Sequence, residues 1–286
     1  MNIIITGGKG MLASNIIPVF SRHHSIITAD IDEWDITSRE KGEAFIREHK
    51  PDVIINLAAI TNVDGCEDIP ETAQKVNGDA PGTVARLCEK YHVKFVHFST
   101  DYVFDGQKDS PYTEEDIPNP QSIYGKTKLS AEIQIRKNNP SAIIMRAEWL
   151  YGGALGGGDF ITKITKVAGE KGRAEVVNDQ NGTPTCAKDI GEPLRALIEN
   201  KRSGVYHISN SGFTTWYGFT KEIFALLNID VPLIPTTSDA YKTKAKRPAN
   251  SVYDISKLQR DTGITMRSWQ EALREYLHTQ KQNTKS

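Results

Sequence analysis

A tyrosine and a lysine four positions apart form the residue pair best suited to proton transfer in this sequence. Tyr124 and Lys128 fall on one face of a predicted helix, where the ammonium can lower the pKa of the phenol and can also hold a ribose. The spacing alone is a weak signal, because the chain repeats it twice. The two other pairs are Tyr217 with Lys221 and Tyr253 with Lys257. The surroundings of each pair must therefore decide among them.

The sequence around Tyr124 favours this pair over the other two. It alone lies between the fourth and fifth predicted strands, after a strand that ends near Thr100. Ligands of parallel sheets bind at the carboxyl ends of the strands. Tyr124 can donate a proton to a carbonyl oxygen while Thr100 hydrogen-bonds that oxygen and stabilises the developing charge. We therefore predict a catalytic group of Thr100, Tyr124 and Lys128, and interpret the two other pairs as helix-surface residues.

A glycine-rich turn follows the first predicted strand. Gly7, Gly10 and Ala13 are spaced three apart at the start of a helix, so the backbone can approach a pyrophosphate that faces the helix N-terminus. A plain connecting loop would hold the same glycines, but the position directly after a strand favours dinucleotide binding. Asp30 ends the second strand and, unless it is a surface turn residue, can bond ribose hydroxyls, which favours NADH. Lys9 can attract a 2′-phosphate, so we expect tolerance of NADPH and NADH.

Short apolar runs that alternate with helical periods predict the fold class. Strands are expected at 2–6, 25–29, 52–57, 94–98 and 142–145, and helices from near Gly10, Ser38, Pro70 and Tyr124. This order is typical of an α/β fold with a Rossmann-type doubly wound parallel sheet. A strand at 174–177 and helices at 187–200, 216–227 and 269–277 predict a smaller α/β substrate-binding lobe. We divide the chain into a dinucleotide-binding domain, 1–146, and this lobe, 147–286, with part of 174–200 as a candidate to return to the Rossmann sheet.

The composition excludes several classes of protein. The chain has 286 residues, of which 38% are hydrophobic and 25% charged, and its formal net charge of −1 offers no basic face to nucleic acid. Three cysteines without metal-ligand or redox spacing are typical of a reducing compartment. No apolar run approaches the ~20 residues that span a bilayer. We expect a cytoplasmic protein with neither nucleic-acid nor membrane partners.

Motifs spread along nearly the whole chain resemble those of one enzyme family. They are 7–11 (GGKGM), 56–61 (NLAAIT), 99–104 (STDYVF), 124–128 (YGKTK), 146–151 (RAEWLY), 178–180 (NDQ), 182–185 (GTPT), 204–207 (GVYH), 214–217 (TTWY) and 247–251 (RPANS). Through them the chain closely resembles the dTDP-4-dehydrorhamnose reductases, which are extended short-chain dehydrogenases. The resemblance implies NAD(P)H-dependent reduction of the C4 keto group of dTDP-4-dehydro-L-rhamnose, the last step of dTDP-L-rhamnose synthesis. The lobe 147–286 would then bind mainly the nucleotide sugar.

The resemblance also implies a set of binding residues. Cofactor contacts fall on Gly7, Gly10, Met11, Leu12, Asp30, Asp35, Ile36, Ala58, Ala59, Ile60, Tyr124 and Lys128. Sugar contacts fall on Thr100, Asp101, Tyr102 and Trp149. The indole of Trp149 can pack on the apolar face of a 6-deoxy sugar, with a place in the core as the alternative. Arg247 suits a diphosphate, although a solvated basic loop is the competing interpretation.

A metal ion and a partner subunit stay open at this point. Some members of the family form dimers through Mg²⁺ held by acidic residues, but the sequence does not place such ligands. Asn15 stands in a helix position where a carboxylate would be needed. This departure puts a Mg²⁺-dependent dimer in doubt and leaves a homodimer by direct contact open.

Two other functions share the same fold. A nucleotide-sugar dehydratase or epimerase would recycle its cofactor, and dehydratases carry an Asp-Glu pair after the threonine, where this chain has Asp101 and Tyr102. A non-catalytic subunit, like the regulatory subunit of methionine adenosyltransferase, would need no catalytic group. Thr100, Tyr124 and Lys128 together favour the enzyme, and the missing second acid favours the reductase.

Overall fold

A six-stranded parallel sheet forms the centre of the molecule in the computed structural model, which describes residues 1–153 and 158–283. Its strands are β1 (Asn2–Thr6), β2 (Ser25–Ala29), β3 (Val53–Asn56), β4 (Lys94–Thr100), β5 (Ile143–Ala147) and β10 (Gly204–Ile208). They follow the order β10-β5-β4-β3-β1-β2 and all pair in parallel. The order reverses between β1 and β3, where open α/β sheets bind ligands at the carboxyl ends. The predicted fold class is confirmed.

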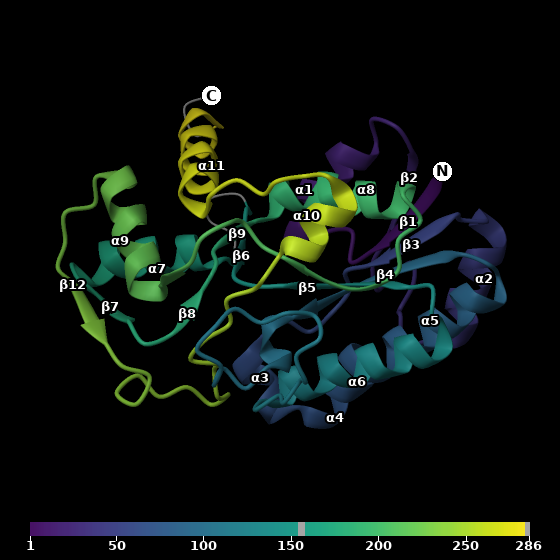
Figure 1. Cartoon of the computed structure of the whole chain (residues 1–286), viewed down its shortest axis with the longest axis horizontal. Coiled ribbons are helices and arrows are strands. Elements are labelled where there is room, and N and C mark those ends of the chain that lie inside the picture. Colours follow the sequence, from purple (N-terminus) through teal and green to yellow (C-terminus); the bar gives the residue numbers. More distant parts are fainter. Residues whose placement is uncertain (154–157, 284–286) are drawn as a thin grey trace.

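Helices cover both faces of this sheet (Figure 1). The first part contributes α1 (Met11–Phe20), α2 (Arg39–His49), α3 (Val63–Asp68), α4 (Pro70–Ala73), α5 (Ala80–Lys90) and α6 (Ile123–Asn138). A π-helical turn, Gln74–Asp79, joins α4 to α5, and a 3-10 turn, Asp101–Val103, follows β4. The later helices α8 (Gly191–Glu199) and α10 (Ser256–Thr262) lie on the same face as α1, opposite α2, α5 and α6.

The six-stranded sheet has two hydrophobic cores, one on each face. Successive side chains of a strand point to opposite faces. Ile3 and Ile5 accordingly pack in the cluster that includes α1 and α8, whereas Ile4 packs in the cluster that includes α2, α5 and α6. Because both faces are covered, the strands are apolar throughout rather than alternating with polar residues. This burial holds the carboxyl ends of β1, β3, β4 and β5 at one edge.

The smaller lobe has a core of its own. Its helices are α7 (Phe160–Lys171), α9 (Trp216–Leu227) and α11 (Trp269–Asn283), and its short strands are β6 (Leu150–Tyr151), β7 (Ala174–Val177), β8 (Asn181–Gly182), β9 (Thr185–Cys186), β11 (Thr214–Thr215) and β12 (Leu233–Thr236). The strands form three two-stranded pairs, β8 with β11, β7 with β12 and β6 with β9. Aromatic and aliphatic residues from α7, α9 and α11 fill the space between them.

The structure departs from the expected elements mainly beyond residue 147. Beyond residue 190 the chain returns to the six-stranded sheet and its helices. There α8 packs against α1, and β10 pairs with β5. The helix expected at 187–200 is a 3-10 turn, Ala187–Ile190, followed by α8. The sequence predicted neither α3, α7, α10 and β10 nor the short strands β6, β8, β9, β11 and β12. No helix within 1–153 or 158–283 is long and apolar enough to cross a membrane.

Candidate active site

A cavity of about 1200 Å³ lies at the carboxyl ends of β1, β3, β4 and β5. Every residue predicted to contact the cofactor lines it, and so do the predicted sugar contacts Thr100, Asp101, Tyr102 and Trp149. Arg247 is not among its lining residues. The cavity therefore brings together residues from between Gly7 and Asp159 at the edge where the sheet order reverses.

The glycine turn is shaped to receive an anion. Gly7 has a φ of +69°, and a Cβ atom there would lie 2.9 Å from the backbone nitrogen of Ala58. Gly10 precedes α1 without any side-chain cap, and no acidic residue occupies the first turn of α1. The first N–H groups of α1 thus point toward the cavity without a side-chain partner, which is the arrangement that binds a phosphate. The residues present fit a dinucleotide.

Two carboxylates, Asp30 and Asp35, line the part of the cavity that is predicted to hold the cofactor, here called the cofactor side. The Oδ2 atom of Asp30 accepts the backbone N–H of Lys9 at 3.0 Å. The ammonium of Lys9 itself is exposed and lies 3.8 Å from Asp32. Asp35 accepts the N–H and the hydroxyl of Thr37, and these hydrogen bonds lower its pKa. The side chain of Asp30 is therefore fixed by a hydrogen bond to the backbone of the glycine turn.

Asn77 is a cofactor-side residue that the sequence analysis missed. It is fully buried on the π-helical turn. Its amide accepts the N–H of Ile60 at 2.8 Å and donates to the Ile60 carbonyl at 2.9 Å. These two hydrogen bonds to Ile60 fix the backbone that follows β3. Ala58, Ala59 and Ile60 on this backbone line the cavity. The only hint in the sequence is an asparagine within an otherwise helical stretch.

Tyr124 is positioned by the first turn of α6. Ser122 caps this helix by accepting the Gly125 N–H at 3.1 Å. A Cβ atom at Gly125 would come within 2.2 Å of the Tyr102 carbonyl oxygen, so glycine alone lets α6 begin this close to the turn after β4. The rings of Tyr124 and Tyr102 meet edge to face at 5.6 Å. Tyr124 and Thr100 both line the cavity.

Lys128 contacts the end of β4 rather than the phenol. Its Nζ atom donates to the Phe98 carbonyl at 2.5 Å and lies 3.3 Å from Nε2 of His97. Burial lowers the pKa of Lys128 to about 8. The expectation that Lys128 lowers the pKa of Tyr124 is not met, since burial and the nearby Asp101 charge raise that pKa. A raised pKa keeps the phenol protonated, as an acid requires.

The part of the cavity that is predicted to hold the sugar, here called the sugar side, is built from stacked side chains. Trp149 has a φ of +43°, a backbone conformation that bulky residues rarely adopt. Its indole stacks on Trp216 at 3.7 Å with planes 10° apart. A Cβ atom at Gly182 would lie 2.4 Å from the same indole. Trp149 is thus half-buried, held by the lobe and by its backbone, while it lines the cavity.

Arg247 binds protein groups. Its guanidinium donates to the Tyr102 hydroxyl at 2.6 Å and to Asp64 at 2.9 Å. Asp64 also accepts the backbone N–H of Ala245, and Lys244 forms an ion pair with Asp68. The interpretation as a solvated basic loop holds for Lys242, Lys244 and Lys246, which are exposed, but not for Arg247, which is half-buried. The predicted contact of Arg247 with a diphosphate stays a prediction.

Asp101 lies beside a second buried acid that the sequence analysis missed. The Asp101 side chain accepts the Thr100 hydroxyl at 2.9 Å, and burial raises its pKa to about 6. Glu148 accepts the Thr183 N–H at 2.9 Å and the Ser251 hydroxyl at 3.1 Å. Burial and the charge of Asp101 raise the pKa of Glu148 well above its ordinary value. An acidic residue directly after the buried strand β5 was the available signal.

Comparisons with known proteins agree with this geometry. Residues 1–282 match the family described as RmlD substrate binding domain. The chain belongs to this family. It is 34% identical to a dTDP-4-dehydrorhamnose reductase of Sinorhizobium fredii, with 96% of each chain covered. It is also 34% identical to the spore coat polysaccharide biosynthesis protein SpsK of Bacillus subtilis, again over 96% of each.

Solved structures extend the family likeness to three dimensions. A dTDP-4-dehydrorhamnose reductase from Clostridium acetobutylicum has a TM-score of 0.93 at 38% identity, over 98% of this chain and all of the other. One from Bacillus anthracis, in complex with NADP, has the same TM-score at 31% identity, over 97% and 99% of the two chains. A UDP-glucose 4-epimerase from Thermotoga maritima, at 21% identity and a TM-score of 0.83, shares the fold alone.

The two other tyrosine-lysine pairs lie away from the cavity of this RmlD-family chain. Tyr217 packs against the lobe core on α9. Tyr253 is buried before α10 and stacks on His207 at 4.0 Å, while Lys257 donates to the Val205 carbonyl. The interpretation as helix-surface residues is therefore wrong for Tyr253. Its ring fills a core between β10 and the turn after β4.

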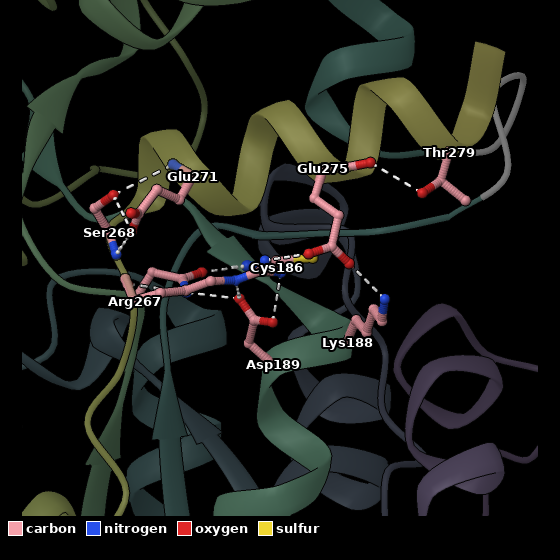
Figure 2. Close-up of polar contacts among 9 residues, drawn as sticks. Cys186, Lys188, Asp189, Arg267, Ser268, Glu271, Glu275 and Thr279 are labelled. Carbon is pink, nitrogen blue, oxygen red and sulfur yellow. Dashed lines mark hydrogen bonds and ion pairs between the residues drawn. The ribbon is translucent and has the colours of Figure 1, made fainter. Parts of the chain in front are cut away.

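Within residues 1–153 and 158–283, no three His, Cys, Asp or Glu side chains gather as a metal site. Asn15 donates to the Gly152 carbonyl at 3.0 Å. Figure 2 shows that acids near α11 are paired with cations: Asp189 binds Arg267 at 2.8 Å, and Glu275 binds both Lys188 and Arg267. These ion pairs join α11 to the 3-10 turn before α8.

Proposed function

We propose that this chain catalyses the NAD(P)H-dependent reduction of the C4 keto group of dTDP-4-dehydro-L-rhamnose to dTDP-L-rhamnose. The observation that carries the proposal is that Thr100, Tyr124 and Lys128 line one cavity together with the glycine turn before α1. Relatives named for this activity, which the chain matches over nearly its full length, support the substrate. The reaction is the last step of dTDP-rhamnose biosynthesis.

The residues divide the work of reduction. The nicotinamide cofactor, when bound, supplies the hydride. Tyr124 donates its proton to the oxygen at C4, and its raised pKa keeps that proton available. The Thr100 hydroxyl hydrogen-bonds the same oxygen and stabilises the charge that develops there. Lys128, buried against the end of β4, holds its charge at the base of the cavity, where it can bind a ribose.

The two parts of the chain divide the binding. Residues 1–146 bind chiefly the cofactor, with Gly7, Gly10, Met11 and Leu12 at the pyrophosphate and Asp30 at the ribose. The remaining cofactor contacts are Asp35, Ile36, Ala58, Ala59, Ile60, Tyr124 and Lys128. The NADP complex of the Bacillus anthracis relative supports NADPH, and the carboxylate of Asp30 supports NADH as well.

The sugar-binding part, 147–286, supplies a stacking surface and a cation. Trp149 packs on the 6-deoxy sugar, and Asp101 and Tyr102 bond its hydroxyls from the turn after β4. Arg247 reaches the diphosphate by exchanging its bonds to Tyr102 and Asp64 for phosphate oxygens. A homodimer by direct contact is compatible with this arrangement and needs no metal ion.

A measurement of cofactor stoichiometry tests the proposal. One NAD(P)H is oxidised for each dTDP-4-dehydro-L-rhamnose reduced, and deuteride from labelled NADPH appears at C4 of the product. A dehydratase would instead turn over dTDP-glucose with no net loss of cofactor, and that outcome would require the reductase assignment to be withdrawn. Inactivity toward both sugars, with tight binding to another protein, would favour a regulatory subunit.

A further inference from the structure

A buried histidine contacts the lysine of the proposed catalytic group. His97 lies on β4 and is 1% exposed. Its Nε2 atom is 3.3 Å from the Nζ atom of Lys128, which is within hydrogen-bond distance. Lys128 lines the cavity, whereas His97 is not among its lining residues. The imidazole therefore acts on the cavity only through Lys128.

Two polar side chains of the sheet hold the other side of the His97 ring. Its Nδ1 atom is 3.0 Å from Nδ2 of Asn56 on β3. The Oδ1 atom of Asn56 is in turn 2.6 Å from the hydroxyl oxygen of Thr6 on β1. Both side chains are buried. A row of polar groups thus crosses three apolar strands and ends at Lys128, and burial of such groups is costly unless each one is hydrogen-bonded.

The ring of His97 is neutral, so one of its nitrogens is an acceptor. Burial and the nearby charge of Lys128 lower the pKa of His97 well below its usual range, and a neutral imidazole carries its hydrogen on one nitrogen only. Burial lowers the pKa of Lys128 to about 8, so this side chain is an ammonium at neutral pH and can only donate. Nε2 therefore accepts from Lys128, and the ring hydrogen lies on Nδ1.

The amide of Asn56 selects between the two forms of the ring. The oxygen and nitrogen of an amide fill almost the same space, so the hydrogen-bond network decides which of them faces Nδ1. With Nδ2 toward the ring, the ring hydrogen would lie on Nε2 and point at the ammonium, donor against donor. With the amide turned over, Oδ1 accepts the Nδ1 hydrogen, and Nδ2 donates to the Thr6 hydroxyl, which can accept. Only the second arrangement fits a charged Lys128.

The ammonium of Lys128 has one hydrogen more than these contacts use. One hydrogen goes to the Phe98 carbonyl, whose oxygen is 2.5 Å from Nζ. A second goes to Nε2 of His97. Two bonds in different directions fix the rotation of the ammonium about its last carbon. The third N–H is thereby left for a ligand in the cavity that Lys128 lines.

The charged groups near Lys128 do not replace His97. Glu132 faces Lys128 from the next turn of α6 and raises its pKa, but Arg146 binds that carboxylate through two nitrogens. Tyr124 lies one turn before Lys128 and has a raised pKa, so it is uncharged. The side-chain acceptor in contact with the ammonium is His97.

We propose that His97 is a positioning residue whose Nε2 atom accepts one N–H of Lys128, so that the buried ammonium keeps its charge and presents its third N–H to the ribose of the cofactor. This inference rests on the proposed reductase function. Asn56 holds the ring in the form that this contact needs.

The pH dependence of cofactor use tests this role. Because Lys128 acts as an ammonium, kcat/KM for NADPH falls as pH rises through its pKa, which is about 8. His97→Asn has an amide that reaches only the position of Nδ1, so Lys128 loses its acceptor. Burial then disfavours the ammonium further, and the alkaline limb moves to lower pH by about one unit, which lowers kcat/KM about tenfold at a fixed pH above both limbs. His97→Gln, whose amide reaches the position of Nε2, restores the wild-type limb.

His207→Asn is the matched control. His207 is also fully buried, and burial lowers its pKa to about 3. Its Nδ1 atom is 3.0 Å from the Tyr112 carbonyl oxygen, and its Nε2 atom is 3.4 Å from Arg146, a cation that does not line the cavity. This variant keeps the wild-type limb. The proposal is overturned if His97→Asn leaves the limb in place, lowers kcat/KM equally at every pH, or shifts the limb no more than His97→Gln does.

Two further measurements do not depend on turnover. Nitrogen NMR of the ligand-free chain at neutral pH shows the His97 ring, assigned by its loss in His97→Gln, with its hydrogen on Nδ1; a hydrogen on Nε2 would contradict the contact. Fluorescence titration shows NADPH affinity falling at lower pH in His97→Asn than in the wild type, and an unchanged profile would contradict the role. Thermal melting checks that the variants are folded. A wild-type chain that binds NADPH but reduces no keto sugar would overturn the reductase function, while both measurements would still decide the role of His97.

Discussion

The cofactor side and the sugar side of the cavity are built in different ways. On the cofactor side the backbone makes the surface: the Gly7 turn, the free N–H groups of α1, and the strand end that Asn77 holds. On the sugar side the side chains hold one another, as Trp149 does with Trp216 and Arg247 with Tyr102. A binding surface made by the backbone has no room for an added Cβ atom, as at Gly7. A binding surface made by side chains depends instead on contacts between residues far apart in sequence.

Tyr124, where the two sides meet, has the largest expected effect. Tyr124→Phe removes the proton donor and lowers kcat about 10²–10⁴-fold, while cofactor affinity stays nearly unchanged. Steady-state kinetics measures the first effect and fluorescence titration with NADPH the second. Tyr217→Phe, on α9 in the lobe, is the control and is near neutral. If Tyr124→Phe kept more than about half of the turnover, another group would have to be the acid.

A methyl group in the glycine turn tests the cofactor side. Gly7→Ala places a Cβ atom 2.9 Å from the Ala58 nitrogen at a φ of +69°, and we expect a loss of about 1–3 kcal/mol in folding stability or cofactor binding. Urea denaturation and NADPH titration measure the two. Gly169→Ala, in α7 with nothing within 4 Å, is the control and gains up to about 1 kcal/mol. Unchanged behaviour of Gly7→Ala would mean that the turn is not tight.

A buried glutamate, Glu148, tests the sugar side through stability. The pKa of Glu148 is raised in the folded chain, so the folded state binds more protons and its stability falls as pH rises above the ordinary pKa of glutamate. Glu148→Gln therefore adds about 1–3 kcal/mol at pH 8 and little at pH 4.5. Denaturation of both proteins at the two pH values measures this difference. A gain that is equal at both pH values would mean that Glu148 does not titrate on folding.

Glu132 is the matched contrast to Glu148. It is also fully buried, but Arg146 binds it through two nitrogens and Ser99 donates to it at 2.6 Å. Glu132→Gln leaves a buried guanidinium without its counter-charge and costs about 3–5 kcal/mol at neutral pH. At pH 8, Glu148→Gln should raise the folding stability and Glu132→Gln should lower it. This difference would show that a neighbouring cation, rather than burial itself, decides whether a buried acid stabilises the fold.

Asp30 has the smallest expected effect. Asp30→Ala removes an acceptor for the ribose of NADH and a repulsive charge for the phosphate of NADPH, so the ratio of KM values changes by about tenfold in favour of NADPH. Steady-state KM values for both cofactors measure it. Asp32→Ala, which lies near the Lys9 ammonium, is the control. An equal change for both cofactors would mean that Asp30 does not face the ribose.

The parts of this protein that the sequence determined are those with a local signal. The local signals are the apolar runs of the first five sheet strands, the spacing of Gly7, Gly10 and Ala13, and the four-residue step from Tyr124 to Lys128. Each of them lies within a single element or turn. Each strand ends at the same edge because the sheet is parallel. That rule was enough to place Thr100, Tyr124 and the glycine turn around one cavity.

The tertiary structure alone decided the pairings between distant segments. Arg247 contacts Tyr102 and Asp64 across 145 and 183 positions of the chain. Ser251 contacts Glu148 across 103 positions, and β10 pairs with β5 across about 60. Burial then set the charge of each group: Glu132 has a guanidinium beside it and Glu148 has another acid. No local pattern distinguishes these two glutamates, because what differs between them is contributed by residues far away in sequence.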